Sequence, residues 1–262
     1  MEHSFWQNLA GDLTAATISA SLVAPTVTII DRALVEKASY HKPLLQSLRS
    51  HAHAALKHPR QFLFSRPHGY VFTLYAATYT VANGTETITK QTHPSISDAV
   101  TFCCTFLVNV PLGVRKDIRF AQFFGTSSQI DPGRNSPPLL RKTGSAVATG
   151  TLLVRDAITI FGSFTLAQRC TDVIPDSLAA HPYSKMIFTQ MVVPVLSQIV
   201  ATPLHLLGLD LYNRQYKIPW ADRLAVVRRD LPSATVIRCV RIIPAFGFGC
   251  LANTGLRSLF HQ

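Results

Sequence analysis

Apolar stretches with few or no charged residues recur along the chain and are separated by polar segments. Six such stretches can be followed: Leu13–Ile30, Pro67–Thr85, Ala99–Val114, Gly144–Gln168, Met186–Leu209 and Ile242–Leu256. Period-two alternation is absent and prolines lie inside the stretches, so none of them resembles a β-strand. The pattern therefore predicts an all-α protein with six principal helices.

The lengths of these stretches suit a lipid bilayer. Met186–Leu209 is the cleanest and is long enough to cross a membrane, which requires about twenty residues. The first stretch carries small residues spaced to let helices approach closely. These are Ala15, Ala16, Ser19, Ala20 and Ser21. Several other stretches are short or contain Thr, Ser, Gln and His, so hydropathy alone supports only about three spans.

Composition agrees with a membrane location. The chain is 47% hydrophobic and 15% charged, whereas an ordinary soluble domain is roughly 25% charged. A mean hydropathy of +0.20 is too low for helices that are apolar all round. It suits helices that face lipid on one side and water on the other. The alternative is a basic, soluble helical protein.

The net charge of +11 is distributed by a simple rule. Eighteen of the 25 Lys and Arg residues lie in the connections that follow the first, third and fifth stretches. Such alternation is typical of the positive-inside bias of a six-span protein. A nucleic-acid-binding protein has no reason to place its charge in every second connection, so we expect no nucleic-acid partner.

The even-numbered stretches end with a regular period. Three amide side chains are spaced by 85 residues both times: Asn83, Gln168 and Asn253. Twelve residues before each amide lie Val71, Asp156 and Arg241. The pattern indicates three internal repeats.

The odd-numbered stretches share a proline near their basic end. These prolines are Pro25, Pro111 and Pro203, separated by 86 and 92 residues. A proline inside a helix removes one backbone hydrogen bond and bends the axis. We therefore predict a kink at the same level of each repeat.

These features together resemble the mitochondrial carrier family, and the resemblance covers almost the whole chain. It implies six transmembrane helices in three two-helix repeats, at approximately 1–90, 91–176 and 177–262. It also implies termini on the face opposite the basic connections, and a short matrix helix in each repeat. Pro43–His58 and Pro219–Leu231 suit such helices, whereas the Pro- and Gly-rich loop 126–142 offers a poor one.

The chain departs from that family at both ends of the expected bundle. The family closes the matrix side with an acid two residues after each odd-helix proline and a base five residues after. Those positions hold Val27 and Ile30, Gly113 and Lys116, and His205 and Gly208. On the opposite side, the three amides stand where the family has acids. We therefore expect no ionic closure at either end, and slow or leaky transport.

Charged pairs lie close to the altered positions. Asp31-Arg32 and Lys116-Asp117 are interpreted as solvated helix ends, with displaced remnants of the family's ionic network as the alternative.

Charges within the stretches are the candidate binding site, because a charge in mid-membrane is expensive to keep. The resemblance places the solute-contact residues at this level: Arg155, Asp156, Arg241, Arg238 and Val71. An adjacent acid and base suit the ammonium and carboxylate of an amino-acid-like solute. The alternative is a structural Arg155–Asp156 pair without a ligand.

No cofactor or metal is expected. His68 and His205 are interpreted as cavity-lining or interfacial residues, since no second ligand lies at metal-binding spacing. The sequence also lacks the motifs of common enzyme classes. We therefore expect a carrier of a small anionic or zwitterionic metabolite in the mitochondrial inner membrane, not an enzyme. The alternative is a non-transporting adaptor or subunit of a membrane complex, with a protein partner. The expected lipid partners include anionic lipids such as cardiolipin.

Overall fold

The computed structural model describes residues 2–40, 42–125, 138–166, 170, 175, 182–214 and 218–261. Within these ranges the chain is helical and contains no strand, as the sequence pattern predicts. The first half comprises α1 (Glu2–Tyr40), α2 (Leu44–Lys57), α3 (Pro59–Leu63), α4 (Arg66–Thr92), η1 (Pro94–Ile96) and α5 (Ser97–Phe124). The second half comprises α6 (Pro138–Ile160), η3 (Phe161–Leu166), α8 (Pro182–Asn213), α9 (Trp220–Ile242), η4 (Ile243–Phe248) and α10 (Gly249–Phe260).

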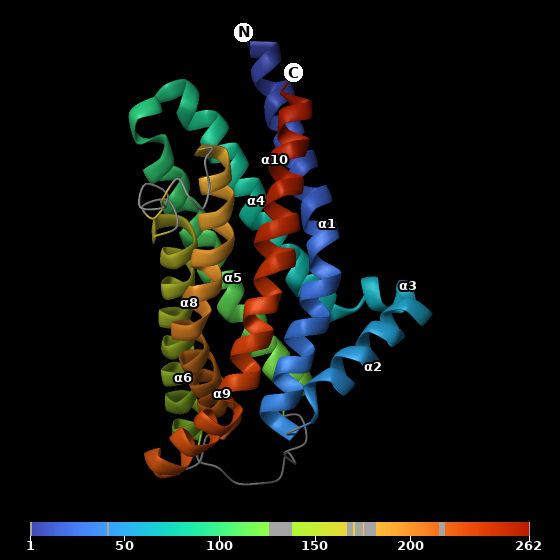
Figure 1. Cartoon of the computed structure of the whole chain (residues 1–262), viewed down its shortest axis with the longest axis vertical. Coiled ribbons are helices and arrows are strands. Elements are labelled where there is room, and N and C mark those ends of the chain that lie inside the picture. The colour runs from blue at the N-terminus through green and yellow to red at the C-terminus, as the bar shows by residue number, and fades with distance from the viewer. Residues whose placement is uncertain are drawn as a thin grey trace.

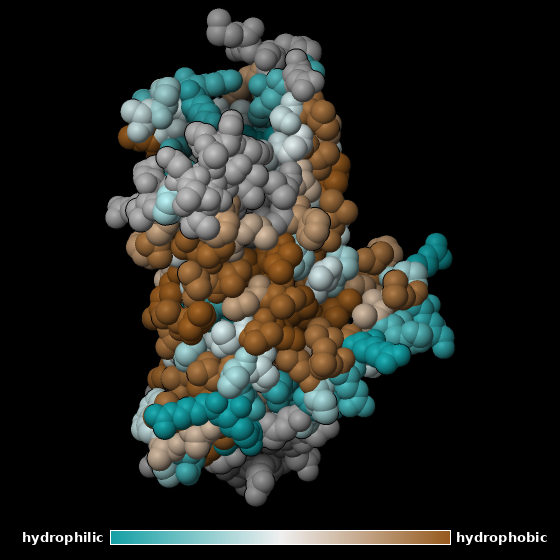
Figure 2. Space-filling view, viewed as in Figure 1, coloured by the Kyte–Doolittle hydropathy of each residue, from teal (hydrophilic) through white to brown (hydrophobic). Residues whose placement is uncertain are grey.

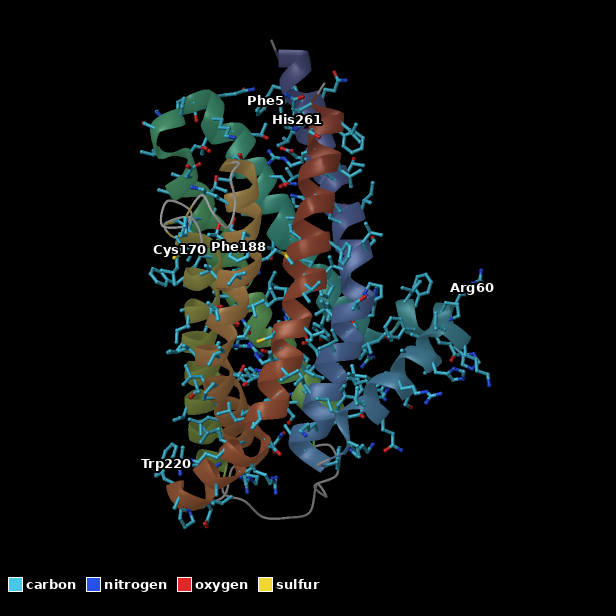
Figure 3. The ribbon with its side chains drawn as sticks, in the orientation of Figure 1. Phe5, Arg60, Cys170, Phe188, Trp220 and His261 are labelled. Carbon is cyan, nitrogen blue, oxygen red and sulfur yellow. The ribbon has the colours of Figure 1, made fainter. Side chains whose placement is uncertain are left out.

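The long helices form a closed ring. α1 packs against α4, α4 against α5, α5 against α6, α6 against α8, and α8 against α9. α10 returns to α1 and completes the circle. Figure 1 shows both termini at one end of the bundle, while Trp220, labelled in Figure 3, lies at the other end. The last residues of α1, α5 and α8, from which the basic connections begin, also meet at this end: Tyr40 bonds to Gly125, and Asn213 bonds to Ser39. We call it the basic end.

Three helices are long and apolar enough to cross a membrane: Phe5–Tyr40, Pro94–Phe124 and Met191–Asn213. These segments belong to α1, α5 and α8, the first long helix of each expected repeat. Figure 2 shows hydrophobic side chains gathered across the middle of the visible face, with hydrophilic side chains toward both ends. The chain therefore has the surface of a membrane protein, and the full six-span repeat remains a prediction.

The small residues of α1 pack as the sequence predicts, with one exception. Ala15, Ala16, Ser19 and Ala20 are completely buried, and Ser21 is exposed. Close approach also occurs between α6 and α8, where Gly208 leaves no room for a side chain. A Cβ atom at Gly208 would lie 2.7 Å from Cδ2 and 2.9 Å from Cγ of Leu152.

Gly208→Ala is expected to destabilise the protein because Leu152 is itself only 1% exposed and has little space to move. We expect a loss of about 1–3 kcal/mol, the usual cost of overpacking. Gly150→Ala is the matched control, since nothing lies within 4 Å of its added Cβ and alanine favours a helix. Thermal unfolding in detergent measures both. Equal stability of the two variants would contradict this packing.

The prolines that are expected to bend helices lie inside the first long helix of each expected repeat. Pro25 is within α1, Pro111 within α5, and Pro203 within α8 together with Pro194. The prediction of a separate matrix helix at Pro219–Leu231 is wrong, because α9 runs without interruption from Trp220 to Ile242. Pro232 is tolerated inside this helix. Loop residues 126–137 and Gln168 lie outside the described residues.

The first short helix agrees with the sequence. Pro43 is the N-cap of α2, which with α3 forms an arm that projects from the bundle, with Arg60 at its tip (Figures 1 and 3). Glu36 fixes the base of the arm by accepting hydrogen bonds from Ser47 Oγ (2.7 Å) and His51 Nε2 (2.9 Å). Burial lowers the pKa of His51.

Candidate functional site

A central cavity of about 380 Å³ lies inside the helical ring. Its wall includes residues of α4, α5, α6, α8, α9 and α10. The volume falls within the range of about 300–1,000 Å³ that is typical of small-molecule sites. A solute-sized compartment therefore lies where the three expected repeats meet.

The cavity brings together four of the five sequence-predicted site residues. Arg155, Asp156, Arg238 and Arg241 line it. Val71 does not: it is completely buried in the hydrophobic core with Val27, Ala24 and their neighbours. The contribution expected from the first even helix comes instead from other α4 residues, including Thr78.

A buried ionic layer closes the cavity toward the basic end. Lys116 Nζ lies 2.5 Å from an Asp31 oxygen and 2.8 Å from an Asp117 oxygen. Asp31 also pairs with Arg241 at 3.1 Å. Asp117 pairs with Arg155. The layer thus links α1, α5, α6 and α9 through alternating charges.

This layer corrects two sequence-based predictions. Asp31 and Lys116-Asp117 are not solvated helix ends, because their side chains are 2–6% exposed. The prediction that the basic end lacks an ionic closure is also wrong. The acids are displaced along their helices: Asp31 and Asp117 each lie six residues after the helix proline, instead of two. His205 joins the layer through Arg155, with 3.2 Å between His205 Nδ1 and Arg155 Nη1.

A second polar layer lies at the end that holds the termini. Buried Asp12 of α1 accepts hydrogen bonds from Arg257 (2.7 Å), His261 (2.9 Å) and Thr87 (2.5 Å). Arg257 also pairs with Glu86 at 2.6 Å. The expected absence of ion pairs at this end is therefore wrong as well.

Two of the three repeat-related amides meet in this second layer. Asn83 and Asn253 exchange side-chain hydrogen bonds of 2.9 and 2.8 Å, which join α4 to α10. The sequence missed Asp12 because the family's pattern places the acids of this layer on even helices, whereas Asp12 lies on α1.

Arg238 differs from the other arginines of the cavity because no carboxylate of the described residues forms an ion pair with it. Its side chain is 2% exposed, and Nη2 donates to Gln198 Oε1 at 2.9 Å. The Nε and Nη1 atoms are buried without a hydrogen-bond partner among the described residues. A buried, uncompensated guanidinium is costly. The Arg238 guanidinium is therefore available to bind an anion, to which it can donate two parallel hydrogen bonds.

The charges of the ionic layer and the adjoining cavity wall do not balance. Four cationic side chains, Lys116, Arg155, Arg238 and Arg241, meet three carboxylates, Asp31, Asp117 and Asp156. The excess is one positive charge, and it corresponds to Arg238. A single carboxylate group from a solute would neutralise it.

Asp156 faces the same cavity. Its carboxylate contacts the adjacent Arg155 at 3.1 Å, and its side chain is 14% exposed against 3% for Arg155. Gly113 of α5 provides room for it, because a Cβ there would lie 3.0 Å from Asp156 Oδ2. Arg155 is therefore committed to the ionic layer through Asp117, whereas Asp156 keeps acceptor capacity toward the cavity.

A family model described as a probable citrulline exporter matches residues 15–261. The chain belongs to this family. Among curated proteins, none matches the chain. Membership in the exporter family, together with the apolar helices, is consistent with a membrane transporter of a small amino-acid-like metabolite. The family is not explicitly that of the mitochondrial carriers, so the finer resemblance stays a prediction.

The sequence did not predict the cavity residues contributed by α5 and α8. Gln198 of α8 and a row of polar residues on α5 line the cavity beside the arginines. The spacing of four residues between the polar residues of α5 can be seen in the sequence. Groups of three or more His, Cys, Asp or Glu arranged to hold a metal ion do not occur within the described part of the chain.

Proposed function

We propose that this chain moves a small zwitterionic amino acid of the citrulline type across the mitochondrial inner membrane. The observation that carries the proposal is Arg238, a buried guanidinium that lines a solute-sized cavity and lacks an acid partner. In the bound state, Arg238 holds the α-carboxylate of the solute by bidentate hydrogen bonding. Asp156 accepts from its α-ammonium. The family description, which names citrulline, supports this solute class.

The proposed architecture is the six-span, three-repeat carrier fold. Support comes from the closed ring of helices and the proline inside each odd long helix. The shared end of the two termini also supports it (Figure 1). In this arrangement the basic connections face the matrix. Anionic lipids such as cardiolipin border them, where residues 42–66 contain basic but no acidic side chains.

The ionic layers favour transport over the adaptor alternative. That alternative was based in part on missing closures, whereas ion pairs are present at both ends of the cavity. Alternating access requires two closed states of similar free energy. Breakable polar layers above and below one cavity provide the contacts that such states exchange.

Purified protein in lipid vesicles provides the test of function. Vesicles loaded with citrulline are expected to take up labelled citrulline by saturable exchange, and empty vesicles without protein are the control. Localisation is measured separately, by protease protection of the tagged protein in mitochondria and mitoplasts. Failure of citrulline and of related neutral amino acids to enter or to stabilise the protein would contradict the proposal.

Asp156→Asn is expected to leave the protein folded while reducing its response to the solute. The carboxylate is the more exposed partner of its pair, so its loss leaves Arg155 still paired with Asp117. The apparent affinity for citrulline, measured by thermal stabilisation, should fall at least tenfold, since a charged hydrogen bond contributes about 1.5–3 kcal/mol. An unchanged response to citrulline, or a protein that no longer folds, would assign Asp156 a structural role only.

A further inference from the structure

A row of polar side chains follows one face of α5 through the whole cavity. Thr101, Thr105, Asn109, Gly113 and Asp117 are spaced by four residues, and all of them line the cavity. Residues spaced by four share one face of a helix. The row begins near the terminal end and reaches the ionic layer at Asp117. Its first three members are neutral, and we call them the α5 ladder.

The hydroxyl groups of the α5 ladder are unlike those of many other threonines in this protein. Ten described threonines donate their hydroxyl to the backbone carbonyl four residues earlier, the usual arrangement in a helix. The Oγ1 atoms of Thr101 and Thr105 are buried without any hydrogen-bond partner among the described residues. Buried polar atoms left unpaired carry a desolvation cost, so these two hydroxyls indicate a missing ligand.

Asn109 continues the ladder toward the charged end. Its Nδ2 donates to Thr78 Oγ1 at 2.9 Å, which fixes the amide between α5 and α4. The carbonyl oxygen of Asn109 remains as an acceptor. The ladder therefore presents two hydroxyls that donate or accept and one amide oxygen that accepts.

We infer that the α5 ladder binds the uncharged, hydrogen-bonding end of the solute side chain, a ureido or carboxamide group. This inference rests on the proposed function, in which Arg238 and Asp156 hold the α-carbon substituents. A ureido group presents a carbonyl acceptor and N–H donors. The Thr105 hydroxyl matches the carbonyl acceptor, and the Asn109 oxygen matches the N–H donors.

The geometry agrees with a solute of this length. Asp156 contacts α5 at Gly113, and Asn109 and Thr105 lie one and two turns away, about 6 and 12 Å along the helix. A side chain with three methylene groups extends from the first level toward Asn109 and Thr105, whereas Thr101, about 18 Å along the helix, lies beyond the reach of its terminal group. No ladder member is charged, and the ionic layer with the adjoining cavity wall already holds one excess positive charge. A cationic guanidinium side chain of the same shape is therefore disfavoured.

The test compares citrulline with two amino acids that share its backbone. Norvaline lacks the terminal polar group, and arginine replaces the ureido oxygen with a charged nitrogen group. Half-saturating concentrations are measured by ligand-induced thermal stabilisation and by competition for exchange. The unmodified protein is expected to bind citrulline at least tenfold more tightly than either analogue, since lost pairing of buried polar groups weakens binding by this order.

Thr105→Val keeps the side-chain shape and removes the hydroxyl that the solute side chain reaches. The variant is expected to reduce the preference for citrulline over norvaline to less than threefold while norvaline binding is retained. Thr14→Val is the matched control, because its hydroxyl bonds to the Ala10 carbonyl at an exposed position.

The possible outcomes test the α5 ladder and the proposed function separately. Unchanged preference in the Thr105 variant, or equal loss of citrulline and norvaline binding, would overturn the ladder and leave the proposed function standing. An unmodified protein that neither binds nor exchanges citrulline would overturn the proposed function and the ladder with it.

Discussion

Replacing Arg238 with glutamine is expected to abolish most citrulline binding while making the empty protein more stable. The variant removes the donor of a bidentate carboxylate contact, and charged hydrogen bonds of this kind contribute about 1.5–3 kcal/mol. The half-saturating concentration should therefore rise by about 10- to 150-fold. The same change removes a buried charge that has no acid partner, so the apo protein should unfold at a higher temperature.

A rise in apo stability together with a loss of citrulline affinity distinguishes a ligand-binding residue from a structural one. Arg228→Gln is the control on the same helix, because Arg228 is exposed, and it should change neither quantity. Citrulline titrations followed by thermal unfolding measure both effects in one experiment. Loss of apo stability in the Arg238 variant with unchanged citrulline affinity would assign Arg238 to the scaffold.

Replacing Asp117 with asparagine is expected to give the largest loss of stability of any single substitution in the ionic layer. Asp117 is the shared partner of Lys116 and Arg155, all three being nearly completely buried. Breaking a buried pair by removing one partner costs about 3–5 kcal/mol because the other charge is left uncompensated. Unfolding in detergent with increasing denaturant measures the difference.

A second variant shows whether the cost comes from the stranded charge. Asp117→Asn combined with Arg155→Met removes one positive charge along with the negative one and should recover part of the lost stability. Asp222→Asn, at an exposed position in the first turn of α9, is the control and should be nearly neutral. A single Asp117 variant as stable as the control would show that the layer does not hold the helices together.

The sequence predicted the helical fold well because its main signals are local. Apolar runs, internal prolines and small residues each act within one helix, and every run falls within helical segments wherever the chain is described. Boundaries between helices were harder to predict. The segment Pro219–Leu231 has the features of a separate short helix, yet it continues into the next helix in spite of Pro232. Packing between helices overrides a local propensity of this kind.

The site was predicted in part. The charged residues Arg155, Asp156, Arg238 and Arg241 were found because charges inside apolar runs are rare. The closures were not found, because they depend on which helices face each other. Asp31 meets Lys116 and Arg241 only after α1 packs beside α5 and α9, and no spacing in the sequence gives that contact. Val71 lies at the spacing of the repeat, but its position on α4 faces the hydrophobic core.

The contacts of Asp12 bear on how the chain is made. This carboxylate, near the start of the first helix, is satisfied by Arg257 and His261, which lie 245 and 249 residues later. Both partners are synthesised long after Asp12, so a growing chain holds this acid without its cations until α10 and His261 have been added. A chain that stops before α10 cannot complete the ring, because α1 then lacks the helix that packs against it. Such a truncated product would expose the uncovered side of α1 and an unpaired acid to cellular quality control.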